Sequence, residues 1–214
     1  MLPQLRLLLD GAFVTAWVSV SAIALGVPLG LLLALVRWRR VPILSPLVAT
    51  YVSLMRATPA ITLTLLVFFA LPELGVDISP APAGVIALLL NTSAFNCEIW
   101  RAALVDFPSD QLQAARAFGM TPARMFRRII FPQIWRTSLP PLVSEMTLLI
   151  KASPAIAVIG VVDLTRAASR IGAATYEPLP PFVVATVLYM LLVLAFVGAQ
   201  RLAERRVMRK FAQA

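Results

Sequence analysis

The sequence contains no histidine and only one cysteine, Cys97, among its 214 residues. Without histidine, the chain lacks the commonest metal ligand and the usual general base of enzymes. A lone cysteine cannot form a disulfide within the chain. These absences exclude a histidine-based catalytic triad and a typical zinc site, so we predict no catalytic residue, no metal and no cofactor.

Charge is also scarce, because only 14% of the residues are charged, whereas a soluble domain carries about 25%. Hydrophobic residues make up 60% of the chain, and the mean hydropathy is +0.87. The apolar runs recur to the end of the chain, so a cleaved signal peptide does not account for them. The pI near 11.2 comes from basic residues beside apolar runs, which argues against nucleic acid as a partner. The composition predicts an all-α integral membrane protein in a lipid bilayer.

Five apolar stretches are long enough to cross the membrane, since a helix needs about 20 residues to span the ~30 Å hydrocarbon core. Together they form one predicted membrane domain over residues 1–214. Pro154 is expected to bend or break the fourth span, because proline lacks the N–H of a helical hydrogen bond. The predicted spans cover about residues 11–36, 46–71, 82–104, 137–160 and 178–200.

The basic residues predict the orientation of these spans, because cytoplasmic loops collect lysine and arginine. In the five-span arrangement, 14 basic residues lie on one side, and Arg6, Arg166 and Arg170 lie on the other. We therefore expect the N-terminus outside and the C-terminus in the cytoplasm.

Residues 106–133 form a polar loop on the predicted cytoplasmic side, between the third and fourth spans. We predict two short helices in it. Ser109 caps the first, Gly119 ends it in a left-handed conformation, and Thr121 with Pro122 starts the second, which runs to about Phe131.

The second of these helices is predicted to be amphipathic, with Met125, Ile129 and Ile130 on one face. This apolar face needs a partner, which is either the lipid headgroup region or another protein. The small residues Ala114 and Ala115 favour a protein, because they permit close approach by another helix.

The loop segment "QAARAFGMTPARMFRRIIFP" resembles the EAA loop of ABC importer permeases, in which Glu-Ala-Ala is followed by glycine and then by an apolar residue with proline. Gln113 stands where that family usually has glutamate. The positions that match the pattern are Ala114, Ala115, Gly119, Ile129 and Pro132.

Two further stretches resemble the polar amino-acid uptake permeases, whose members carry histidine, glutamate, glutamine, arginine or opines. "YVSLMRATPAITLTLLVFFALP" is similar to their Arg-Gly-Thr-Pro region, with Ala57 in place of glycine. "SLPPLVSEMTLLIKASPAIAVIGVVDLTRAASR" is similar to their Leu-Pro-Pro, Glu, Lys and Asp-Leu-Thr segment. The resemblance covers roughly residues 10–205.

The resemblance implies a permease subunit of the bacterial plasma membrane. Its implied partners are a second permease protomer, identical or not, two cytoplasmic ABC ATPase subunits and an extracytoplasmic solute-binding protein. The chain has no GxxxxGK[ST] phosphate-binding loop, so we expect ATP hydrolysis in a separate subunit. The loop then acts as the coupling helix, with the predicted docking residues Gln113, Ala114, Ala115, Gly119, Met125, Ile129 and Pro132.

Charged residues within spans are candidates for the substrate pathway, because a charge near a helix centre costs ~2.5–3.5 kcal/mol on insertion scales. Glu145 has no basic residue one turn away, which predicts an interior position. The resemblance further implies that Glu145 and Lys151 help to form an amino-acid pocket. The predicted pathway residues are Glu145, Lys151, Glu98, Asn91 and Arg56.

These residues also have simpler interpretations. Glu98 could pair with Arg101 one turn further on, and Lys151 and Arg56 could extend to the membrane surfaces. Gly26 and Gly30 form a GxxxG pattern that permits close packing, within the chain or against a partner helix.

Two other functions stay open on the residues alone. The first is a self-sufficient ion- or proton-coupled carrier or channel that uses Glu98, Glu145 and Lys151, although a carrier needs no docking loop. The second is a membrane enzyme, which the lack of histidine and of paired carboxylates in one motif disfavours.

Overall fold

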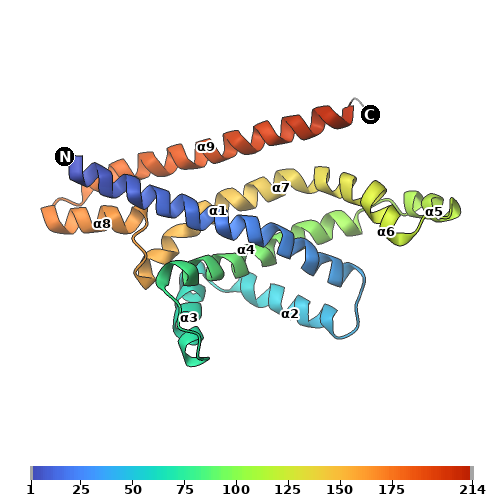
Figure 1. Ribbon diagram of the computed structural model, residues 1–214, viewed down its shortest axis with the longest axis horizontal. Coiled ribbons are helices and arrows are strands. Elements are labelled where there is room, and N and C mark those ends of the chain that lie inside the picture. The colour runs from blue at the N-terminus through green and yellow to red at the C-terminus, as the bar shows by residue number, and fades with distance from the viewer. Residues whose placement is uncertain (1, 213–214) are drawn as a thin grey trace.

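The computed structural model describes residues 2–212, with side chains over residues 3–202, and this part of the chain is helical without any β-strand. Figure 1 shows long helices running side by side along the molecule, with shorter helices at both ends. The α-helices are α1 (Leu2–Trp38), α2 (Leu44–Ala57), α3 (Ala60–Glu73), α4 (Pro80–Val105), α5 (Ser109–Ala117), α6 (Pro122–Met125), α7 (Phe131–Ala152), α8 (Leu164–Thr175) and α9 (Leu179–Ala212).

The helices are long and apolar enough for a membrane protein. Within the described residues, four helices meet the length and hydropathy of a span, and the bent pair α2–α3 makes a fifth if it counts as one span. The prediction of an all-α membrane fold with about five spans is therefore confirmed.

Helix α1 packs closely along α4 because glycine removes the side chains at their crossing. A methyl group on Gly26 would overlap the Thr92 methyl group, and one on Gly30 would lie 2.6 Å from Asn96 Cβ. The GxxxG pattern thus serves packing within the chain rather than contact with a partner helix.

The predicted second span, 46–71, is wrong as a single helix. Helices α2 and α3 meet at an angle of 116°, and between them Thr58 is extended (φ −86°, ψ 127°). Pro59 explains the break, since proline has no N–H to donate and disfavours helical geometry in the residue before it. Helix α3 consequently points away from the bundle (Figure 1).

The boundary predicted between the loop and the fourth span, near 131–137, is also wrong, because one helix runs from Pro122 to Ile159. It contains a π-helical turn, Phe126–Ile130, in which the Phe131 N–H bonds to Phe126 O, five residues back. In an ordinary helix Pro132 would clash with the carbonyl of Arg128, and we attribute the wider turn to this proline. The break expected at Pro154 is confirmed in milder form, since the α-helix ends at Ala152 and tightens into a 3₁₀ segment, Ser153–Ile159.

Helix α8 is an element that the sequence analysis did not predict, and it joins the end of the long helix to α9. Its cap, Asp163, accepts hydrogen bonds from Arg166 N (2.9 Å) and from the Tyr189 hydroxyl on α9 (3.1 Å). The adjacent Leu164 N–H donates to Thr15 Oγ1 on α1 (3.2 Å). Burial raises the pKa of the Asp163 carboxyl, against the hydrogen bonds that lower it. This cap therefore ties together α1, α8 and α9.

The two ends of the molecule differ in charge. Figure 1 shows the N-terminus and α8 at one end, and the α1–α2 turn, the loop helices α5 and α6 and the C-terminus at the other. The second end carries the arginine-rich segments 37–40, 116–128 and 201–210. The fold thus brings together the segments that the charge bias assigns to one side.

Candidate functional site

Glu145 lies inside the bundle, as the sequence predicts, with only 8% of its surface exposed. Its carboxylate lies near the Thr92 hydroxyl of α4 and within electrostatic reach of Arg56 on α2. Thr92 in turn accepts a hydrogen bond from Asn96 Nδ2 (3.3 Å). A buried carboxylate near a hydroxyl and within reach of a cation can bind an ammonium group or a proton.

The end of α2, just before the break at Pro59, is attached to α4 beside this carboxylate. Asn91 Nδ2 donates to Met55 O (3.3 Å), and the Arg56 guanidinium stacks 5.2 Å from the centre of the Phe95 ring. The structure therefore brings Arg56, Asn91 and Glu145 into one region of the α2–α4–α7 interface.

Lys151 is not part of that region. It is exposed on α7 and lines a separate groove of about 400 Å³, together with Pro154 and the α9 residues Thr186 and Tyr189. No described acidic side chain forms an ion pair with it. The lysine and Glu145 thus occupy different surfaces of the same helix.

Glu98 joins two arginines at the other end of α4. Arg101 Nη2 and Nε lie 2.9 and 3.1 Å from Glu98 Oε2, and Arg37 on α1 bonds to the second oxygen. The pairing with Arg101 is as predicted, whereas Arg37, 61 residues away in the sequence, was not. Because both oxygens already bond to cations, Glu98 links helices more readily than it receives a solute.

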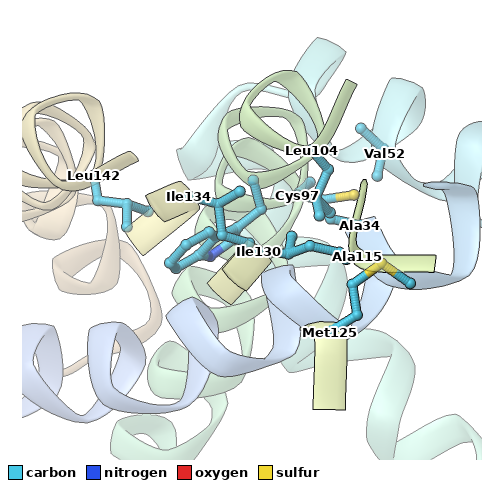
Figure 2. Close-up of a cluster of buried hydrophobic side chains, with 11 residues drawn as sticks. Ala34, Val52, Cys97, Leu104, Ala115, Met125, Ile130, Ile134 and Leu142 are labelled. Carbon is cyan, nitrogen blue, oxygen red and sulfur yellow. The ribbon is translucent and has the colours of Figure 1, made fainter. Parts of the chain in front are cut away.

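The inner face of the 106–133 loop packs on the chain's own bundle. Figure 2 shows Ala115, Met125 and Ile130 in one buried cluster with Ala34 of α1 and Leu104 of α4. The apolar face left open to lipid or protein in the sequence analysis is therefore covered within the chain. Of the predicted docking residues, Ala115 and Met125 anchor the loop and are not exposed to a partner.

The outer face of the loop carries the remaining docking candidates. Gln113, Ala114 and Gly119 are exposed, while Ile129 and Pro132 are half-buried. Phe118, which the sequence analysis did not single out, is 87% exposed. The feature of the sequence that could have indicated this residue is its position directly before Gly119, the glycine at the corner between the two loop helices.

The corner between the loop helices has the predicted geometry. Gly119 is left-handed (φ 69°), and the Thr121 side chain accepts a hydrogen bond from Arg124 N (3.4 Å), with Pro122 opening α6. The predicted cap at Ser109 is wrong. Pro108 occupies the cap position, and the Ser109 hydroxyl bonds to Asp110 instead.

Among the described residues, no three Cys, Asp or Glu side chains come together as metal ligands would.

Comparisons with known proteins agree over nearly the whole chain. Residues 26–209 match the family described as binding-protein-dependent transport system inner membrane component. The arginine transport system permease protein ArtQ of Bacillus subtilis (strain 168) is 33% identical over 206 residues, which cover 96% of this chain and 94% of that protein. The histidine/lysine/arginine/ornithine transport system permease protein HisQ of Salmonella typhimurium is 31% identical over 210 residues, with 93% and 92% covered. A solved structure described as the crystal structure of an amino acid ABC transporter with histidines superposes with a TM-score of 0.85 at 33% identity, covering 96% of both chains.

Proposed function

Since this chain belongs to the family of binding-protein-dependent transport system inner membrane components, we propose that it forms the membrane pathway of an ATP-driven importer of amino acids or related zwitterionic solutes. Its place is the bacterial plasma membrane. It works there with cytoplasmic ABC ATPase subunits, a second permease protomer and an extracytoplasmic solute-binding protein.

The single helix Pro122–Ile159 is the observation that carries the proposal. Its first turns belong to the polar loop, and its middle carries the buried Glu145. A motion applied to the loop by an ATPase would therefore reach the carboxylate through continuous helix. A self-sufficient carrier would have no use for this connection.

The relatives support an amino acid as the solute, since ArtQ and HisQ are named for arginine and for histidine, lysine, arginine and ornithine. All of these carry an α-ammonium and an α-carboxylate. Glu145 can bind the ammonium, and Arg56 lies within electrostatic reach of the same carboxylate. Lys151 lies on a different surface of α7, in the groove beside α9, so it can meet the solute carboxylate only at another point of the pathway.

The surface of the bundle supports a second permease protomer. Ile61, Leu66 and Phe69 of the projecting helix α3 are 55%, 57% and 64% exposed, and only 6% of an 18-residue stretch of the span Leu179–Leu202 is buried. Apolar area of this kind on one chain is covered by lipid or by another transmembrane chain.

The ATPase docks on the outer face of the loop. Gln113 and Ala114 on α5 and Phe118 at the corner face away from the bundle. An exposed aromatic next to small residues is the pattern of an anchor that enters a pocket of its partner. The residues on the inner face then hold this anchor in position.

Reconstitution in proteoliposomes tests the function. The chain is combined with a candidate ABC ATPase and solute-binding protein, and uptake of labelled amino acids is measured with and without internal ATP. We expect uptake that requires ATP, the ATPase and the loaded binding protein. Equal uptake by the chain alone under a proton gradient would instead identify a self-sufficient carrier.

A further inference from the structure

We propose that a groove between the end of α1 and the loop helices binds an anionic phospholipid of the inner leaflet. The groove has a volume of about 520 Å³ and is formed by Trp38 and Arg39 at the end of α1 and by residues of α5, α6 and the π-helical turn. It lies apart from Glu145 and from the outer face of the loop.

The floor of the groove is apolar. Leu112, Met125 and Phe126 line it, and Met125 also belongs to the buried cluster that anchors the loop. A soluble anion such as free phosphate would gain nothing from this floor, whereas the first carbons of an acyl chain would bury apolar area there. The floor therefore favours a ligand with a hydrocarbon part.

The rim of the groove is basic. Arg39 and Arg116 line it from α1 and α5, and neither forms an ion pair with a described acidic side chain. Two unpaired guanidinium groups over an apolar floor are complementary to a phosphodiester with its chains attached. Basic pockets beside spans on the cytoplasmic side bind lipid headgroups on the same principle.

The depth of the groove also fits a lipid. Trp38 ends α1, and tryptophan is enriched where spans meet the headgroups. Directly after it, the α1–α2 turn exposes Ile43 (76%) and Leu44 (50%) beside Arg39 and Arg40. Exposed apolar side chains directly after two arginines place this turn at the boundary between headgroups and acyl chains.

A lipid in the groove would contact α1 and both loop helices at once. It would thus brace the loop from the membrane side and leave Gln113, Ala114 and Phe118 free for a protein.

Lipid binding by the purified full-length chain tests the proposal. Dioleoyl phosphatidylglycerol is titrated into the detergent-solubilised protein, and bound lipid is counted by native mass spectrometry, with dioleoyl phosphatidylcholine as the neutral comparison. Each basic side chain near an anionic surface adds about a fivefold factor to binding. We expect the pair R39Q/R116Q to lower affinity for phosphatidylglycerol about tenfold or more and to abolish its preference over phosphatidylcholine.

Two further pairs make this result specific. R39K/R116K keeps both charges and should retain the preference. R124Q/R127Q removes two exposed arginines that do not line the groove, so it should bind phosphatidylglycerol like the wild type. Equal losses in R39Q/R116Q and R124Q/R127Q would mean unspecific attraction and would overturn the proposal.

Two other ligands are distinguished by the same variants. Displacement of the lipid by millimolar inorganic phosphate would show that the acyl chain plays no part, which contradicts the proposal. A loss of ATPase capture in R39Q/R116Q with unchanged lipid binding would assign the groove to the ATPase and overturn the proposal as well.

Discussion

At the scale of single residues, Glu145 places a carboxylate inside the bundle, where packing alone does not require a charged side chain. A buried carboxylate is costly unless its bonds are satisfied, and here a hydroxyl lies near it and Arg56 lies within electrostatic reach. A leucine would fill the same volume without this cost. The carboxylate is therefore best explained by a ligand that needs its charge.

We predict that Glu145→Gln, which keeps the shape of the side chain, lowers uptake of the amino acid. A hydrogen bond to a charged group contributes about 1.5–3 kcal/mol, so apparent affinity should fall roughly ten- to a hundredfold. Assembly with the ATPase, and ATPase stimulation by the loaded binding protein, should persist. The measurements are uptake and ATP hydrolysis in the same proteoliposomes.

Glu73→Gln provides the matched control, because Glu73 is exposed at the end of α3 and lies outside the proposed pathway. Its uptake should equal that of the wild type. Unchanged uptake by Glu145→Gln would remove this residue from the pathway, and loss of the assembled complex would make its role structural.

The sequence predicts some residue contacts and not others, according to their separation along the chain. The pairing of Glu98 with Arg101 follows from helical spacing, and the interior position of Glu145 follows from the cost of an unpaired charge in a span. The bonds of Glu98 to Arg37 and of Asp163 to Tyr189 join different helices. Such contacts depend on how helices are paired in space, which no local pattern reveals.

At the scale of elements, the corner at Gly119 is the part of the loop whose backbone conformation depends most clearly on one residue. Its φ of 69° is left-handed, while a side chain there would meet no other atom within 4 Å. The restriction is thus conformational and not steric. Position 119 therefore allows backbone strain to be tested without a packing change.

We predict that Gly119→Val impairs coupling of ATP hydrolysis to uptake, since left-handed geometry costs an L-residue roughly 1–2 kcal/mol and more for a β-branched one. The corner would shift, and the outer face with Phe118 would turn away from its partner. ATPase capture and the number of solutes transported per ATP are the quantities to measure.

Gly119→Asn is the companion variant, because asparagine tolerates the left-handed region, and it should couple like the wild type. Normal coupling in Gly119→Val would count against docking through this corner.

Proline shows where element boundaries can and cannot be predicted from sequence. The predictions of a helix start at Pro122 and of a break at Pro154 are correct. Pro59, in contrast, breaks a span that was predicted to be one helix. Three other prolines lie inside helices, namely Pro132, Pro140 and Pro141. Pro132 is accommodated by a π-helical turn, and this outcome depends on packing against the bundle.

At the scale of the whole molecule, the uneven distribution of arginine predicts which end lies in the cytoplasm. The described fold gathers the α1–α2 turn and the loop helices at one end, away from α8 (Figure 1). The membrane orientation itself remains a prediction from the charge bias.

We predict that a cysteine at Arg39 reacts with a membrane-impermeant maleimide only after cells are permeabilised. The native thiol, Cys97, is fully buried and is replaced by alanine for this measurement. Asp77→Cys, in the exposed turn between α3 and α4, should be labelled in intact cells and serves as the outer control. Labelling of Arg39→Cys in intact cells would show that the orientation is the reverse of the one proposed.

The continuity of the helix from the loop to Glu145 has a mechanical consequence. The 23 residue steps from Pro122 to Glu145 extend about 35 Å at 1.5 Å per residue, so a tilt of about 5° about the Pro122 end displaces the carboxylate by about 3 Å. A separate docking helix joined by a flexible linker would absorb such a tilt. Here the loop and the carboxylate belong to one lever, and a small rotation in the cytoplasm becomes a displacement as large as the solute's own functional groups.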